Sequence, residues 1–215
     1  LGDQQTTCEK CKDIPAPQLA SLVNNIVMKA IKDSGAKTEL IANLWGWSSS
    51  RGWTKEMIEQ GISLLDKDVS VLRVSEIGME IEKFGEQGKV GEYSISQVGP
   101  SELAKSDLLY AKNTGHKTYA KIQVNNSWEC SLVPMIPVFD LVYEHLQNLK
   151  DVGVSDYQLS WTLGGYPSIT LDLVKCFSQG VSLDEWYKMQ FNENAQKVHN
   201  AISLLCDSFR NYPFS

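Results

Sequence analysis

Short apolar runs alternate with amphipathic segments along the chain, and this alternation constrains the fold more than any other feature of the sequence. Four near-continuous apolar runs predict buried strands, centred near residues 41, 72, 121 and 160. Between and after these runs, apolar residues repeat at the spacing of a helix. Buried strands that alternate with helices are typical of a parallel sheet covered by helices on both faces. The pattern therefore predicts an α/β fold.

The number of strand–helix units limits the architecture further. A complete (β/α)8 TIM barrel needs eight such units and about 250 residues, whereas only four units are recognisable among these 215 residues. We expect a partial (β/α)8 barrel, with an open four-stranded sheet as the alternative. The expected division is an N-terminal segment over 1–17, half of a catalytic barrel over 18–171, and a C-terminal helical region over 172–215.

Half a barrel leaves strand edges and an apolar face uncovered. We therefore expect the chain to belong to a longer protein or to associate with another copy. Residues 76–100 contain five of the fifteen glycines and are predicted to be a long loop, a place where binding segments often lie.

Charge and hydropathy exclude two classes of partner. The formal net charge is −6 and no cluster of Lys or Arg offsets it, which argues against nucleic-acid binding. No apolar stretch approaches the roughly 18 residues that a membrane span needs. The three histidines, His116, His145 and His199, are isolated in sequence and lack the spacing of a metal site. No cofactor is implied.

The five cysteines are at positions 8, 11, 130, 176 and 206, which is not a disulfide framework. Cys8 and Cys11 form a CxxC motif, which by itself is half of a four-ligand zinc site. The motif is either part of a structural metal site whose other ligands lie outside the chain, or a pair of thiols that is unlinked or joined in a local disulfide.

The ends of the predicted strands carry side chains suited to binding or catalysis. In parallel α/β folds, functional side chains gather at the carboxyl ends of the strands. Indole rings stack on sugar rings, amides bind hydroxyls, and two carboxylates can cleave a glycosidic bond. The sequence therefore predicts a carbohydrate site with Glu76 and Glu129 as catalytic candidates. The expected sugar-binding residues at these ends are Trp45, Trp47, Asn125, Asn126, Trp128 and Trp161, with Glu92 from the long loop.

Each of these residues also has a structural interpretation. Glu76 can cap a turn or pair with a lysine, Glu129 falls in a loop, and Glu92 can be a solvated loop residue. Trp45 and Trp47 flank a glycine, so at least one of the two rings is expected to pack in the core.

Three segments resemble a group of bacterial barrel proteins that are loosely similar to the family 20 β-N-acetylhexosaminidases. The segments are Val90-Gly91-Glu92-Tyr93-Ser94-Ile95-Ser96, Val124-Asn125-Asn126-Ser127-Trp128-Glu129 and Leu159-Ser160-Trp161-Thr162-Leu163-Gly164-Gly165-Tyr166-Pro167-Ser168. The resemblance covers roughly residues 38–215. It implies that the chain is the C-terminal half of a (β/α)8 barrel, that it hydrolyses glycosides, and that Tyr93 and Tyr166 join the substrate-binding residues.

One departure from that family is important for the mechanism. Family 20 enzymes use an adjacent Asp-Glu pair at a strand end, and the only such pair here, Asp184-Glu185, lies in a helical segment. The acids are therefore either Glu76 and Glu129 or residues of an N-terminal half. The alternative function is a non-catalytic carbohydrate-binding barrel domain.

Overall fold

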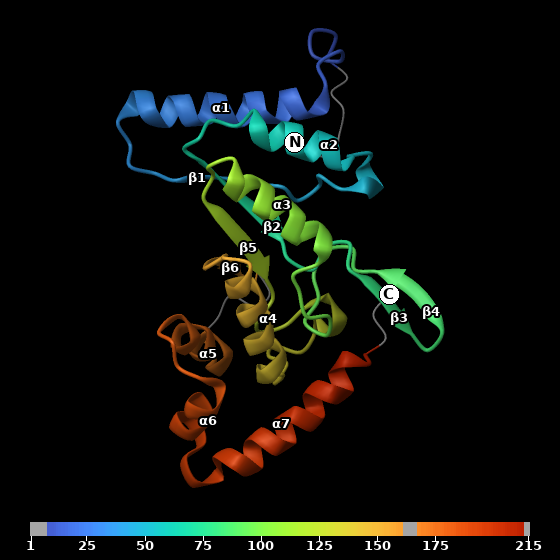
Figure 1. The fold of residues 1–215 in the computed structure, drawn as a ribbon, viewed down its shortest axis with the longest axis vertical. Helices are drawn as coiled ribbons and strands as arrows, with labels where there is room; N and C mark the ends of the chain where they lie inside the picture. Colours follow the sequence, from blue (N-terminus) through green and yellow to red (C-terminus); the bar gives the residue numbers. More distant parts are fainter. Residues whose placement is uncertain (1–7, 161–166, 213–215) are drawn as a thin grey trace. The chain divides into compact units, whose positions relative to one another are not determined.

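The computed structural model describes residues 8–160 and 167–212, and it consists of helices alternating with strands (Figure 1). The helices are α1 (Ala16–Ser34), α2 (Lys55–Ser63), α3 (Glu102–Asn113), α4 (Phe139–Asp151), α5 (Ile169–Ser178), α6 (Leu183–Phe191) and α7 (Ala195–Arg210). The strands are β1 (Leu40–Asn43), β2 (Val69–Val74), β3 (Glu80–Lys83), β4 (Glu86–Lys89), β5 (Thr118–Ile122) and β6 (Asp156–Leu159).

The four predicted strands form one parallel sheet, in the order β1-β2-β5-β6. In the β1–β2 pair, Leu40 lies beside Val69 and Asn43 beside Leu72. Strand β2 is buried at every position, as expected for a strand with helices on both faces. The α/β prediction is therefore confirmed, while closure into part of a barrel stays a prediction.

The chain divides into two compact units, which we describe separately. Unit 1 comprises Leu1–Val74 and Ser106–Tyr119, and unit 2 comprises Ser75–Lys105 and Ala120–Ser215. The division into residues 1–17, 18–171 and 172–215 stays a prediction.

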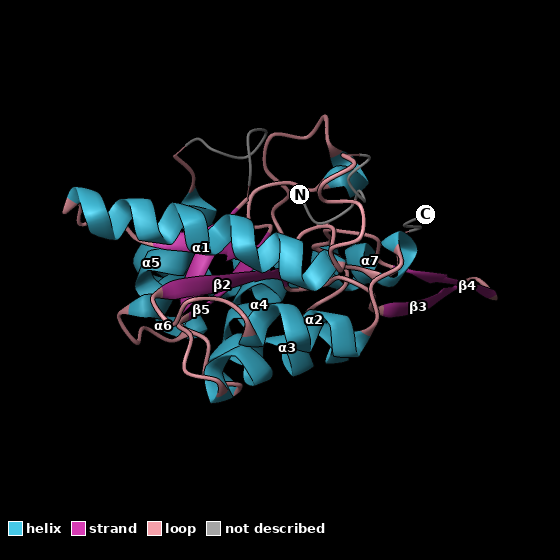
Figure 2. Ribbon diagram, turned by 90° about the horizontal axis from the view of Figure 1, so that it is seen from above, coloured by secondary structure: helices cyan, strands magenta, loops and turns pink. Residues whose placement is uncertain are grey.

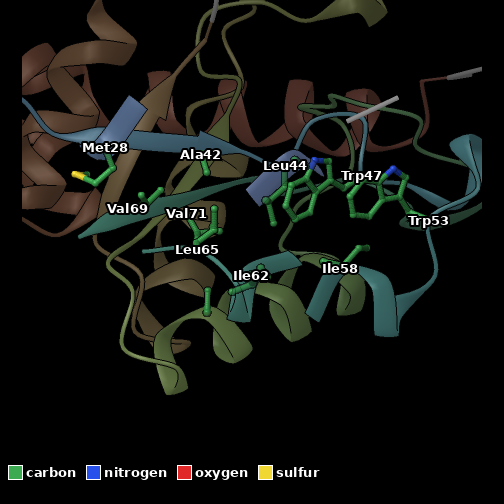
Figure 3. Packing of buried hydrophobic residues seen from close by; sticks show 12 residues of the cluster. Met28, Ala42, Leu44, Trp47, Trp53, Ile58, Ile62, Leu65, Val69 and Val71 are labelled. Carbon is green, nitrogen blue, oxygen red and sulfur yellow. The ribbon is translucent and has the colours of Figure 1, made fainter. Parts of the chain in front are cut away.

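The core of unit 1 lies between β1, β2 and helix α2 (Figure 3). Apolar side chains of the strands, such as Ala42 and Val71, face Ile58 and Ile62 of the helix. Gly61 of α2 leaves space for the Trp47 ring, because a Cβ there would lie 2.6 Å from it. The periodic apolar positions of α2 thus become its buried face.

Unit 2 contains α4 to α7, which pack around buried aromatic rings. Phe139 of α4 contacts Trp186 of α6 edge to face, with ring centroids 5.1 Å apart. Asp140 joins three helices, since it accepts hydrogen bonds from Tyr187 of α6 (2.7 Å) and Ser203 of α7 (2.8 Å). The C-terminal residues predicted to be helical are therefore built into this unit.

The prediction of a long loop over residues 76–100 is wrong in part, because this segment contains an antiparallel hairpin. Strands β3 and β4 pair from Glu80–Lys89 to Lys83–Glu86. They are joined by Phe84 and Gly85, which both have positive φ (54° and 83°), as a two-residue hairpin turn requires. The hairpin projects beyond the helices of unit 2 (Figure 2). Its strands are mostly exposed and charged, so they lack the apolar signal by which the others were recognised.

Within the described part of the chain, no helix has the length and apolar character that a membrane span requires.

Candidate active site

Glu76 lies in the turn that follows β2, and its carboxyl group is completely buried. Its Oε1 atom is 3.3 Å from Nε2 of His145, a buried residue of α4. The hydroxyl of Ser75 lies 2.7 Å from the same ring nitrogen. Because both groups face one nitrogen, this cluster lacks the arrangement of a catalytic triad, in which the two imidazole nitrogens have different partners.

Burial favours the neutral forms of both Glu76 and His145. Burial raises the pKa of Glu76 well above its usual value, and the nearby charge of Glu129 raises it further. Backbone N–H groups of Glu76 and Ser94 act in the opposite direction, but burial is the larger effect. Burial lowers the pKa of His145 to about 3. Burial therefore favours the protonated form of Glu76 next to an uncharged imidazole.

The carboxylate of Glu129 is surrounded by hydrogen-bond donors. It accepts from the Ser94 hydroxyl (2.7 Å) and from the backbone N–H groups of Ile95 (2.8 Å) and Ser96 (3.2 Å). The hydroxyls of Ser96 and Ser127 donate to it as well. Since backbone amides only donate, the oxygens that they contact act as acceptors. Glu129 thereby joins the segment 94–96 to the short helix Trp128–Cys130, which Ser127 caps.

The two carboxyl groups predicted to be catalytic belong to the same unit and are electrostatically coupled. One is a buried acid whose pKa is raised, and the other is an acceptor held by several donors. Unequal environments of this kind separate the roles of two carboxyl groups, as proton donor and as base or nucleophile. In this structure both are closed to solvent, with Glu76 at 0% and Glu129 at 8% exposure.

Glu92 and Tyr93 lie near a buried lysine that the sequence analysis did not single out. The ammonium of Lys121, on β5, is 4.7 Å from the centroid of the Tyr93 ring. Burial lowers the pKa of Lys121, and the charge of Glu92 opposes this shift. Burial, with the charge of Glu92, raises the pKa of Tyr93 to about 12. The phenol of Tyr93 is therefore neutral near Glu76.

The predicted amides are buried, and the indole beside them is exposed. Asn125 and Asn126 are almost inaccessible, and Oδ1 of Asn125 accepts from the Ser168 hydroxyl at 2.5 Å. Trp128 is 50% exposed, so part of its ring is open to a ligand.

The remaining predicted residues are placed differently. In unit 1, Trp47 is buried and stacks on Trp53 with 4.4 Å between ring centroids, so its ring is part of the core. Trp45 is 37% exposed, and the Arg51 guanidinium lies 4.5 Å from its ring centroid. The expectation that at least one of the two rings packs is thus confirmed. Trp161 and Tyr166 lie outside the described residues.

Sequence reasoning missed two further residues of unit 2. His145 was treated as isolated because it is 69 residues away from Glu76, and its place on an amphipathic helix resembles that of any core residue. Gln123 is 2% exposed, and neither polar atom of its amide has a hydrogen-bond partner in the structure. The alternation of Lys121, Gln123 and Asn125 was a usable signal, since polar residues at every second position of a buried strand share one face.

Comparison with known proteins adds no relative: no family model, curated protein or solved structure matches the chain. Within residues 8–160 and 167–212, no group of three or more His, Cys, Asp or Glu side chains is arranged to hold a metal ion.

Proposed function

We propose that the protein is an O-glycosyl hydrolase, with N-acetylhexosaminides among the candidate substrates. The observation that carries the proposal is the coupled pair of Glu76 and Glu129. Burial raises the pKa of Glu76, and a carboxyl group with a raised pKa can protonate the oxygen of a leaving group. The resemblance of three segments to barrel glycosidases supports the same class, and two of these segments contain Glu129 and the serines that bind it.

In this proposal Glu76 is the general acid and Glu129 is the base or nucleophile. His145 of α4 lies 3.3 Å from Oε1 of Glu76, and the Ser75 hydroxyl, 2.7 Å from the same ring nitrogen, fixes the imidazole there. Retaining glycosidases have carboxyl groups about 5–5.5 Å apart, and inverting enzymes about 6.5–9.5 Å. The stereochemistry of the product, followed by NMR, therefore reports the separation of the two groups in the working site.

Substrate binding requires the site to open, because both carboxyl groups are covered. The segment 94–96 is bound to Glu129 and lies next to Glu76 through the Ser94 N–H group. Movement of this segment would release donors from Glu129 and expose Glu76 together. The exposed ring of Trp128, next to Glu129 in sequence, provides a platform for a sugar at the same place.

The test is a hydrolysis screen of aryl glycosides with the wild-type chain and the variants Glu76→Gln and Glu129→Gln. We expect each variant to lower kcat about 10²- to 10⁴-fold, the usual contribution of a positioned acid or base. Glu86→Gln, an exposed carboxylate of β4, is the matched control and should keep full activity.

The leaving group tests the role of Glu76 specifically. A dinitrophenolate needs no proton to depart, so Glu76→Gln should lose far less activity on dinitrophenyl glycosides than on phenyl glycosides. If both catalytic variants match the Glu86→Gln control, the assignment of the acids is wrong.

One observation favours the alternative of a non-catalytic carbohydrate-binding domain. The five donors around Glu129 fill its roughly four acceptor positions, which suits a structural carboxylate. This alternative expects no turnover of any glycoside by the wild-type chain. It also expects sugar binding, followed by tryptophan fluorescence, that is lost in Trp128→Ala.

A further inference from the structure

The CxxC motif near the start of unit 1 has no part in the proposed hydrolysis, and its geometry is that of a closed turn. The backbone N–H groups of Cys11 and Lys12 both donate to the carbonyl of Cys8, at 2.9 Å each. A turn with this bond between its first and fourth residues keeps their Cα atoms within about 7 Å. A disulfide spans Cα atoms about 4.4–6.8 Å apart. The two cysteines can therefore be linked with little movement of the backbone.

The two thiols are accessible and differ in acidity. Cys8 is exposed and Cys11 half-buried. The backbone N–H of Lys10 lowers the pKa of Cys8, and a hydrogen bond from the Cys11 thiol lowers it further. The same hydrogen bond raises the pKa of Cys11. The thiolate form is thus favoured at Cys8 and disfavoured at Cys11.

Two other cysteines of the chain provide a contrast. Cys176 and Cys206 are buried, and burial raises the pKa of both, that of Cys206 to about 11. No third metal-binding side chain joins Cys8 and Cys11 in the described part of the chain. The accessible pair therefore matches a reactive dithiol better than it matches a metal site.

We propose that Cys8 and Cys11 are a redox-active dithiol that exchanges with disulfide compounds. The Cys8 thiolate attacks one sulfur of the disulfide, which forms a mixed disulfide and releases the first thiol. Cys11 then loses its proton and attacks the Cys8 sulfur, which closes the internal disulfide and releases the second thiol. The dithiol gives up two electrons, and the attacked disulfide takes them up as it becomes two thiols. This inference does not depend on the proposed glycoside hydrolysis.

The test uses oxidised glutathione as the disulfide. The reduced wild-type chain is incubated with glutathione buffers of increasing oxidised fraction, quenched with acid, alkylated and mapped by mass spectrometry. We expect a Cys8–Cys11 disulfide to form and to open again in reduced glutathione. Cys176 and Cys206, which are buried, should stay reduced and therefore be alkylated at every glutathione ratio, as internal controls.

Two variants separate the attacking sulfur from the resolving sulfur. Cys11→Ser should accumulate glutathione on Cys8, because nothing resolves the mixed disulfide. Cys8→Ser should acquire glutathione on Cys11 at least about threefold more slowly, because Cys11 is half-buried and lacks the Lys10 N–H contact that lowers the pKa of Cys8. Circular dichroism checks that both variants keep the fold of the wild type.

Three outcomes would overturn the inference. The first is that no internal disulfide forms while the two thiols remain open to alkylation. The second is equal glutathione incorporation in the two variants, which would remove the distinction between the sulfurs. The third is stoichiometric zinc that protects both thiols in the wild-type chain, which would make the motif a metal site.

Discussion

Two buried clusters of ionisable residues, one in each unit, avoid an unpaired buried charge in opposite ways. One contains Arg73 and the other contains Glu76, three positions later in the sequence. In unit 1, Arg73 and Asp107 have opposite charges, with Nε 2.9 Å from Oδ2. In unit 2, Glu76 and Glu129 are both carboxyl groups, and burial with the nearby charge of Glu129 favours the protonated, uncharged form of Glu76. An ion pair is neutral without exchanging anything with solvent, whereas a protonated carboxyl group is neutral only while it holds that proton. An ion pair is therefore suited to a structural role, whereas a buried carboxyl group with a raised pKa has a proton that it can donate.

The cluster of unit 1 is also anchored to the backbone. Nη1 of Arg73 donates to the carbonyls of Leu44 (2.9 Å) and Trp47 (3.1 Å). Burial outweighs the attraction between the partners, since it lowers the pKa of Arg73 and raises that of Asp107 to about 6. Such a pair contributes little net stability when intact, but it is costly to break.

The largest effect is expected when this ion pair is broken. Arg73→Leu leaves Asp107 buried without its partner, so we expect the free energy of unfolding at pH 7 to fall by about 3–5 kcal/mol in urea titrations. The double variant Arg73→Leu/Asp107→Leu should recover most of this loss. Lys29→Met, which removes one partner of an exposed pair with Asp33, is the control and should change stability by less than about 0.5 kcal/mol. A loss as small as in the control would contradict the structural role.

The next largest effect is expected at Glu129. Glu129→Ala removes the acceptor of several buried donors, each costly to leave unpaired, so unfolding should require about 3 kcal/mol less. Glu86→Ala on the exposed hairpin is the control and should leave stability within about 0.5 kcal/mol. Equal stabilities of the two variants would show that the serines and amides around Glu129 find other partners.

A smaller loss is expected at Gly99, where the chain passes close to the Glu76 cluster. A Cβ on Gly99 would lie 2.6 Å from Nε2 of His145 and 2.7 Å from Oγ of Ser75, both buried. Gly99→Ala should therefore lower the unfolding free energy by about 2 kcal/mol through overpacking. Gly91→Ala is the matched control, because a Cβ there meets nothing within 4 Å. If the two alanine variants unfold at the same urea concentration, the close approach at Gly99 is not important for stability.

The effect of Glu76 differs from these three because it depends on pH, and it tests the protonation of that carboxyl group. Its pKa is higher in the folded chain than in the unfolded chain, so between these two values the folded state holds a proton that the unfolded state has released. The contribution of Glu76 to the free energy of unfolding is therefore fully present below its unfolded pKa, about 4.3. This contribution is lost as the pH rises towards the pKa of Glu76 in the folded chain.

Glu76→Gln resembles the protonated acid and cannot titrate. We expect it to match the wild type near pH 4 and to be the more stable protein at pH 7. The gain should be about 1.4 kcal/mol for each pH unit between the unfolded pKa of Glu76 and the lower of two values, pH 7 and its folded pKa. Urea titrations across this range give the comparison, and parallel curves for the two proteins would mean that Glu76 is ionised when folded.

The sequence predicted the strands of the parallel sheet well because each is a continuous apolar run bounded by turns. The hairpin was missed because β3 and β4 are charged, and their turn is Phe-Gly rather than the commoner Asn-Gly or Asp-Gly. The same limit applies to the site. Glu76 was identified from its position after a strand, whereas the contact with His145 depends on how α4 packs, which no local pattern encodes.

The charged hairpin has a consequence for how the protein behaves at high concentration. Exposed strand edges are templates on which other chains can add, which leads to aggregation. Glu80, Lys83, Glu86 and Lys89 place both signs of charge along the two strands of this ribbon. A second copy approaching the edge meets charges that must be desolvated, although Phe84 at the tip is 82% exposed. The ribbon thus projects from unit 2 while its own side chains oppose self-assembly.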